Sequence, residues 1–290
     1  MNLKNYTESK ARGLTSLLKR MTPEQLDVFE ERNVLLATGQ GSREGCLRTL
    51  SSDCKVRSML AYFKEKNQRS LKQWAFLSAK ARIALIHETR EFYLFEDLLW
   101  PLISDNHEAI EWCRQFDLLY ELPEKVTKFD KNDEKSWMFN QYQSWLALNA
   151  RWDELGERSE RILSMENQIT KDRSGLIDHR FYLALAAGDS SAMKAVLLEM
   201  VTPAVRRKRY LQQSGITWDL IDSYATIFAK LAWRAGYELE LDTPWIPKEW
   251  LPVNPLPNYD EPWPFMRDFD IWQPFCEPYA HLSPKRPDSI

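Results

Sequence analysis

The stretch from Thr217 to Tyr259 constrains the fold more than any other part of this sequence. In its first half, apolar residues recur every three or four positions from Ile221 to Ala235, which predicts a helix over 218–235. The polar stripe of this helix is narrow, and it holds Asp222, Thr226, Lys230 and Arg234. Gly236 suits the left-handed position that follows a helix end. We therefore expect a central helix that other elements cover on most sides.

The residues after Gly236 change from a helical to an alternating pattern. The apolar ones are Tyr237, Leu239 and Leu241, and the acidic ones are Glu238, Glu240 and Asp242. Strict alternation is typical of an extended segment with one buried and one solvated side. The prolines that follow, from Pro244 to Pro284, exclude a long regular helix. We expect an irregular strap, rich in proline and aromatic residues, that packs on the helical body.

Helical patterns occupy most of the remaining chain. The expected helices cover 7–21, 22–37, 43–66, 71–90 and 106–120. The sequence Thr22-Pro23-Glu24-Gln25 combines a Thr cap, a proline in the first turn and a glutamine at the capping-box position. Asn106 is expected to cap the last of these helices.

A weak internal repeat follows at an offset of 37 residues. Residues 145–153 align with 182–189, and each copy joins an aromatic-Leu-Ala-Leu helix end to a turn and a second helix. Periods in the thirties are typical of helix-turn-helix solenoids, but two copies are fewer than such an array requires. The repeat favours locally stacked hairpins and leaves a true TPR array as the alternative.

These patterns predict an all-α chain of stacked antiparallel helical hairpins, TPR/HEAT-like in part. An N-terminal helical half (1–130), a hairpin half (131–242) and the strap (243–290) are expected to form one globular unit. The charged segment 126–135 is the expected linker or exposed loop between the two halves.

Charge is distributed unevenly along a chain whose net charge is only −3. Through Arg90 there are 17 basic and 9 acidic residues, whereas from Tyr237 to the end there are 4 basic and 10 acidic residues. The two ends should therefore complement each other or a partner. Because the N-terminal basic residues are scattered among acids, the pattern does not predict nucleic-acid binding.

The sequence predicts neither a membrane protein nor an exported one. No apolar run approaches the ~20 residues that cross a bilayer, and the N-terminus has no signal-peptide pattern. The four cysteines form no CxxC pair. We expect a cytoplasmic protein with free thiols.

Catalytic, cofactor and metal motifs are not found, so we do not expect an enzyme. The four histidines are far apart, and none has a second histidine or a cysteine at metal-ligand spacing. The sequence contains no G-x-S-x-G motif, and nothing resembles a phosphate-binding loop. The basic run 206–209 could meet phosphate or an acidic partner, or could be a solvated helix end.

The strap and the acidic exit of the central helix are the candidate partner-binding region. Exposed aromatic rings within an acidic rim are typical of interface hot spots. The candidates are Glu238, Glu240, Asp242, Tyr259, Asp260, Glu261, Trp263, Asp268 and Asp270. The alternative for the aromatic residues is that each ring plugs the helical body.

Residues 178–265 resemble immunity proteins of bacterial polymorphic-toxin and type VI secretion systems, in particular the helical "immunity protein 49" type. The matching features are the Leu-Ala-Leu-Ala-Ala-Gly-Asp turn at 183–189, Tyr224-Ala225, the run 229–232, Gly236, the Glu-Leu-Glu-Leu-Asp exit, Ile246-Pro247, Trp250-Leu251-Pro252 and Pro257-Asn258-Tyr259. These residues are mostly structural, and residues 1–130 match no family.

The resemblance implies a stoichiometric inhibitor that binds a cognate toxin protein and blocks its active site. It implies no catalytic residue, metal or cofactor. The missing signal peptide adds the hypothesis of a toxin that acts in the cytosol. Two alternatives remain: a helical-repeat scaffold for another protein, and an enzyme with a deep polar pocket beneath Asp178, His179 or the 238–242 acids.

Overall fold

The computed structural model describes residues 3–90, 94–115, 131–134, 136–169 and 173–288. These residues form helices and no strand, which confirms the all-α prediction. The α-helices are α1 (Leu3–Leu18), α2 (Pro23–Thr38), α3 (Arg43–Phe63), α4 (Gln68–Thr89), α5 (Leu94–Ser104), α6 (His107–Arg114), α7 (Trp137–Leu148), α8 (Trp152–Ser164), α9 (Leu176–Ala186), α10 (Ser190–Met200), α11 (Pro203–Lys208), α12 (Ser223–Arg234) and α13 (Pro264–Arg267). Short 3-10 turns include η4 (Tyr210–Gln212), η5 (Lys248–Trp250) and η6 (Ala280–Leu282).

The predicted start signals cap the N-terminal helices. Thr22 accepts a hydrogen bond from the Gln25 backbone N–H at 3.4 Å, and Asn106 accepts one from Ala109 at 2.8 Å. The expected extension of the latter helix to residue 120 is not seen, because α6 ends at Arg114 and residues 116–130 lie outside the described chain. Residues 126–130 and 135 of the expected linker 126–135 likewise lie outside the described chain.

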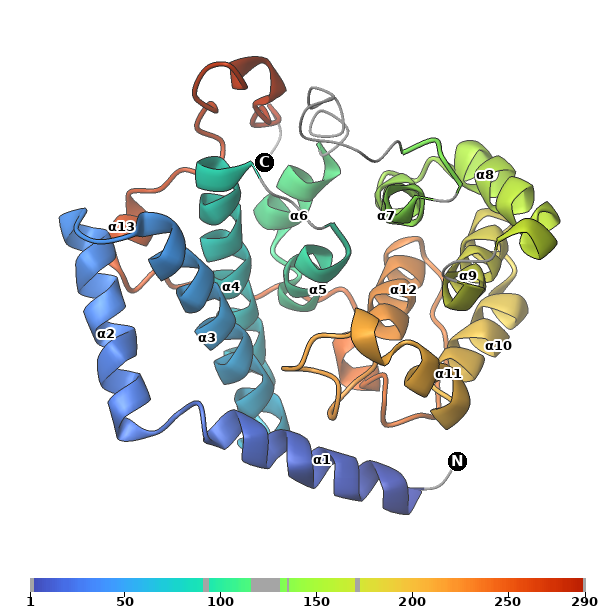
Figure 1. Cartoon of the computed structure of the whole chain (residues 1–290), viewed down its shortest axis with the longest axis horizontal. Helices are drawn as coiled ribbons and strands as arrows, with labels where there is room; N and C mark the ends of the chain where they lie inside the picture. The colour runs from blue at the N-terminus through green and yellow to red at the C-terminus, as the bar shows by residue number, and fades with distance from the viewer. Residues whose placement is uncertain (1–2, 91–93, 116–130, 135, 170–172, 289–290) are drawn as a thin grey trace.

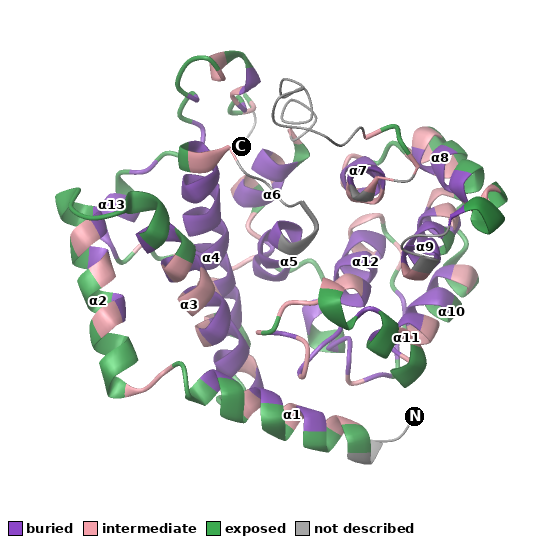
Figure 2. Cartoon of the chain, in the orientation of Figure 1, coloured by how far each residue is buried: buried purple, intermediate pink, exposed green. Residues whose placement is uncertain are grey.

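Helices α3 and α4 form a long antiparallel hairpin on one side of the molecule (Figure 1). Helix α4 is buried along most of its length, as its mostly purple ribbon in Figure 2 shows. Its polar residues are consequently paired: Lys72 with Asp105, and Arg82 with Asp97 at 2.8 Å. The sequence pattern of α4 gives no sign of such complete burial.

Two hairpins, α7–α8 and α9–α10, form the other side, where α8 packs on α9 (Figure 1). The two turns make equivalent backbone hydrogen bonds at an offset of 38 residues, so the predicted offset of 37 is wrong. The backbone N–H of Arg151 donates to Leu146 O at 3.0 Å, and that of Asp189 donates to Ala184 O at 2.9 Å. Backbone capping sets this register, whereas the sequence alignment matched side-chain types one position away.

The central helix α12 lies between the two sides, and it packs on α5 and α10. It begins at Ser223 rather than at 218, because the Asp222 carboxylate accepts from the Ala225 N–H at 3.0 Å and caps the helix there. The predicted end is confirmed: Gly236 has a φ of +92°, and Tyr237 N–H bonds back to Ala232 O at 2.9 Å.

The strap is irregular, as predicted, and it returns across the N-terminal helices. Trp263 packs on Phe29 of α2 with ring centroids 5.5 Å apart, and Glu261 pairs with Lys80 of α4. Within the described chain the opposite charges of the two ends thus meet in the Lys80–Glu261 ion pair, and hydrogen bonds such as that from Tyr62 to Glu249 add to the aromatic packing. One continuous core runs from Leu17 to Leu282. No helix in the described chain is long and apolar enough to span a membrane.

Candidate protein interface

The acidic exit of α12 presents its carboxylates to solvent, as the alternation predicts. Leu239 and Leu241 are buried, with 4% and 6% of their surface exposed, and hold the segment against the body. The acidic residues that alternate with them, Glu238, Glu240 and Asp242, are exposed. Among the described residues, none of these three acids forms an ion pair, so their charge is available to a partner.

An open groove of about 550 Å³ runs beside this exit. Its apolar lining comes from Trp233, Leu239, Leu241 and Leu251, and its charged lining from Glu240, Asp242, Glu249, Lys194 and Lys248. The sequence analysis did not select Glu249, whose side chain accepts from Tyr62 O–H at 2.7 Å. Only the fold brings this acid to the 240–242 segment, and no local pattern marks it. The groove therefore combines apolar area with three carboxylates and two lysine ammonium groups, and Glu238 lies beside it on the same exit. We call it the acidic groove.

The predicted aromatic candidates serve to attach the strap. Tyr259 is half-buried; its O–H donates to Ser104 O and accepts from Leu256 N–H at 3.0 Å. Trp263 is buried against Phe29 and Trp74. For these two rings the packing agrees with the alternative stated above, in which aromatic residues plug the body.

The remaining acidic candidates lie apart from the groove. Asp268 follows α13, which Figure 1 places on the opposite side of the molecule from α10. Asp270 pairs with Arg286 at 2.9 Å, and Glu261 pairs with Lys80. Asp260 has an exposed side chain beside α4, where its backbone N–H donates to Gln73. The structure therefore gathers Glu238, Glu240 and Asp242 and leaves the other predicted acids elsewhere.

The polar stripe of α12 meets a buried cluster of charges that the sequence analysis did not find. Lys230 Nζ lies 2.6 Å from Asp105 Oδ1, and Lys72 Nζ contacts the other oxygen of the same carboxylate. All three side chains are almost fully buried. The strap joins this cluster, because Asn254 N–H donates to Asp105 at 3.2 Å and Lys230 donates to Pro252 O at 3.3 Å. The cluster ties α4, the α5–α6 turn, α12 and the strap together.

This cluster predicts a pH dependence of stability. Burial lowers the pKa of Lys230 from 10.5 to about 8, and the Asp105 carboxylate opposes the shift. Between these two values the unfolded chain binds the proton that the folded chain has lost, so the contribution of Lys230 to stability rises with pH. We expect Lys230→Met to remove this rise. Urea unfolding of both proteins at about pH 7.5 and about pH 9.5 checks it; equal pH slopes would contradict it.

The fold buries two residues of the basic run 206–209 and leaves the other two exposed, so neither interpretation from the sequence describes the whole run. Arg209 is buried and makes a bidentate pair with Asp178, at 2.6 and 2.8 Å. Arg206 is buried between two tryptophans, whereas Arg207 and Lys208 are exposed. A solvated helix end is therefore the wrong interpretation for the two buried arginines.

Asp178 and His179, named above as sites for an alternative enzyme, are fully buried. The Asp178 carboxylate is used by Arg209 and also accepts from Asn140 at 2.9 Å. Burial, together with the charges of Arg158 and Arg209, lowers the pKa of His179 to about 3. This histidine is neutral at physiological pH, and both residues belong to the packing of α9.

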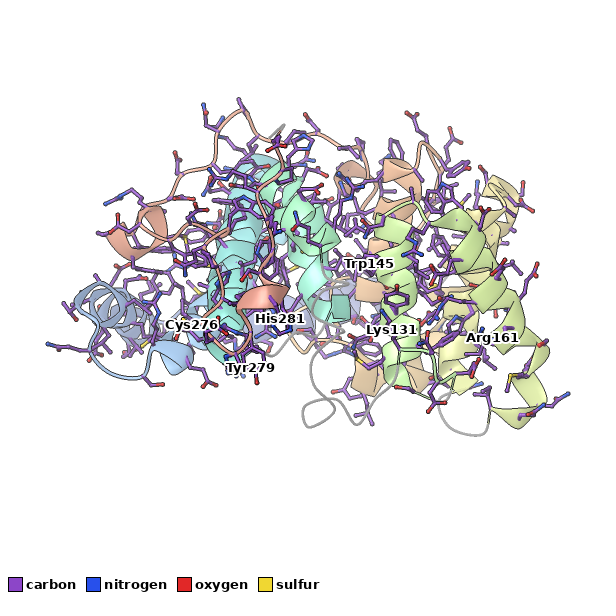
Figure 3. The ribbon with its side chains drawn as sticks, turned by 90° about the horizontal axis from the view of Figure 1, so that it is seen from above. Lys131, Trp145, Arg161, Cys276, Tyr279 and His281 are labelled. Atoms are coloured by element: carbon purple, nitrogen blue, oxygen red, sulfur yellow. The ribbon has the colours of Figure 1, made fainter. Side chains whose placement is uncertain are left out.

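The described residues contain no group of three metal-ligating side chains. Figure 3 shows Cys276, Tyr279 and His281 together near the end of the strap, beside α4, with Lys131, Trp145 and Arg161 around α7 and α8 on the other side. Trp145 there donates its indole N–H to Arg114 O at 2.9 Å. These labelled side chains belong to separate packing regions rather than to one convergent site.

No protein-family model, curated protein or solved structure matches this chain.

Proposed function

We propose that this protein is an immunity protein that binds a cognate bacterial toxin and blocks its active site. One observation carries the proposal: the exit of α12 places Glu238, Glu240 and Asp242 in solvent, unpaired with any described residue, beside a groove with apolar lining. Apolar area supplies affinity, and an acidic rim steers a basic partner and fixes its orientation. The sequence resemblance of residues 178–265 supports the same function.

The acidic groove favours a toxin with a basic active site. Enzymes that act on nucleic acids or nucleotide cofactors bind phosphate groups through Lys and Arg, and their active sites are correspondingly positive. A carboxylate-lined surface can occupy such a site as a substitute for the phosphates. A peptidoglycan hydrolase as the cognate toxin would contradict this part of the proposal.

Co-expression tests the function directly. The product of the adjacent reading frame, expressed alone, should arrest growth, and co-expression of this protein should restore it. The helical-scaffold alternative predicts that this protein binds another protein and gives no protection. Growth arrest that persists despite soluble co-expression would reject the immunity function.

The groove itself is tested by reversing its charge. The triple variant Glu238→Lys, Glu240→Lys, Asp242→Lys should weaken toxin binding by roughly a hundredfold, about 2.8 kcal/mol at 1.4 kcal/mol per decade, because like charges then face each other across the interface. Calorimetric titration at two salt concentrations measures this, and the variant should also lose the salt dependence of wild-type binding.

A matched control has the same change in net charge elsewhere. Asp27, Glu30 and Glu31 are exposed on α2, which lies in Figure 1 on the opposite side of the molecule from α10, whose Lys194 lines the groove. Their triple replacement by lysine should leave binding within about twofold of wild type. Equal losses in the two triple variants would show that net charge matters and that the groove does not.

A further inference from the structure

A second cavity lies between α1, α11 and the turn that precedes α12, and it shares no lining residue with the acidic groove. Its volume is about 290 Å³, at the lower end of the range for small-molecule sites. Its lining brings together three arginines and three aromatic residues. They are Arg12, Arg206, Arg207, Tyr6, Trp218 and Trp245.

The inner wall of this cavity is a layered stack. The Arg206 guanidinium carbon lies 3.2 Å from the centroid of Trp245 and 4.5 Å from that of Trp218. The Arg206 side chain is only 7% exposed, and its NH2 group donates to Trp218 O. Its Nε lies 3.5 Å from an Asp222 oxygen and makes no hydrogen bond within the described chain. A buried cation with an unused donor is thus part of the lining.

The other two arginines leave positive charge at the mouth of the cavity. Arg12 reaches Asp219 through one nitrogen at 3.1 Å, while 65% of its side chain stays exposed. Arg207 is exposed and has no ion pair with a described residue. Among the described residues, Glu8 is the carboxylate that lines the cavity, while Asp222 and Asp219, outside the lining, pair with Arg206 and Arg12. Because these two acids already pair with Arg206 and Arg12, Arg207 supplies the positive charge that no described carboxylate neutralises, and this charge favours an anion.

We propose that this cavity is a binding site for a small anion attached to a planar ring, of which a nucleoside monophosphate is a simple example. Guanidinium groups hold phosphate or carboxylate oxygens through charge-assisted, often bidentate hydrogen bonds. Indole faces hold a planar ring by stacking. Trp218 is half-buried: Arg206 and Tyr210 pack on its ring at 4.5 and 4.9 Å, and the part of the side chain that stays exposed is accessible to a ligand.

Calorimetric titration of the full chain with AMP, ribose 5-phosphate and adenosine separates the two parts of this ligand. AMP carries both the anion and the ring, and each of the other two probes lacks one of them. We expect AMP to bind at least about tenfold more tightly than either, because an interaction with a charged group and a stacked ring each contribute.

Two neighbouring residues provide a matched pair of variants. Arg207→Gln removes a lining cation, whereas Lys208→Gln removes an exposed cation that does not line the cavity. Arg207→Gln should weaken AMP binding at least about tenfold, and Lys208→Gln should leave it within about twofold. Both side chains are exposed, so thermal melting of both variants should match wild type and exclude misfolding as the cause.

Three results would overturn the proposal. They are no AMP binding at millimolar concentration, equal affinities for AMP and ribose 5-phosphate, and equal losses in the two variants. The third would mean that general surface charge attracts the anion. None of these results bears on toxin binding, since the acidic groove is a separate surface.

Discussion

Replacing Asp105 with asparagine is expected to destabilise the folded protein by about 3–5 kcal/mol. Asp105 is the carboxylate that neutralises the buried ammonium groups of Lys72 and Lys230. Without it, two buried cations lose their counter-charge, and Arg234, 4.0 Å from the same carboxylate, adds a third nearby. Asparagine keeps the side-chain shape and also tolerates the left-handed backbone at this position, where φ is +58°. The loss therefore reports on charge rather than on backbone strain.

A double-mutant cycle with Lys230→Met separates the pair from its surroundings. Removing Lys230 alone should cost little, because Lys72 still neutralises Asp105 and methionine fills the buried space. The double variant Asp105→Asn, Lys230→Met should recover part of the stability lost by Asp105→Asn, because one uncompensated buried cation is gone. Urea unfolding at neutral pH measures all four proteins.

Asp270→Asn is the control, because it makes the same replacement of aspartate by asparagine at an exposed ion pair. Asp270 pairs with Arg286 at the surface, where both side chains are more than half exposed, and such pairs contribute about 0–1 kcal/mol. A loss at Asp105 no larger than the loss at Asp270 would contradict the assigned role of the buried cluster.

Replacing Phe228 with alanine should cost about 3–5 kcal/mol of stability. Its ring is fully buried in α12; it stacks on Phe181 at 4.8 Å and meets the edge of Tyr182 at 4.9 Å. The alanine variant leaves a cavity between α12 and α9 that rigid helices cannot fill. Because the side chain never reaches the surface, the folded fraction of the variant should bind the toxin with wild-type affinity.

Urea unfolding gives the stability loss, and calorimetry at low temperature, where the variant remains folded, gives the affinity. Leu211→Ala is the matched control, since the Leu211 side chain is 94% exposed and its truncation should change stability by less than about 0.5 kcal/mol. A Phe228→Ala protein that keeps its stability and loses its partner would place α12 in the interface rather than in the core.

Local signals in the sequence predict much of this fold. The Thr22 cap, the Gly236 helix end and the alternation over 237–242 each depend on neighbours a few residues away, and the structure agrees with all three. The register of the two hairpins is a counterexample. There the backbone of the turn overrides the side-chain similarity that the alignment used.

Long-range pairing explains what the sequence does not reveal. The sequence shows Lys230 only as a member of the narrow polar stripe, because its partner, Asp105, is 125 residues away along the chain. Arg206 and Arg209 read as members of an exposed basic run, although Trp245 and Asp178 bury them. A helical pattern shows which residues share a face, but it does not show which faces the fold will cover.

The candidate sites also differ in whether they depend on neighbours in the sequence or on long-range packing. The acids at 238, 240 and 242 could be selected from the sequence because alternation predicts that they face solvent. Glu249 and the cavity beside Arg206 could not be selected from the sequence. Their surroundings come from distant parts of the chain, such as Tyr62 of α3 for Glu249 and Tyr6 of α1 for the cavity. Such sites exist only after α1, α3 and the strap have packed.

We propose that this protein inhibits a toxin by forming a stoichiometric complex through the acidic exit of α12. Titrating the purified product of the adjacent reading frame with this protein, while following both enzyme activity and the mass of the complex by light scattering, tests it most directly. We expect toxin activity to end at a 1:1 molar ratio with the wild-type protein, whereas the Glu238→Lys, Glu240→Lys, Asp242→Lys variant should need a large excess. Unchanged toxin activity at any ratio, with no complex formed, would contradict it.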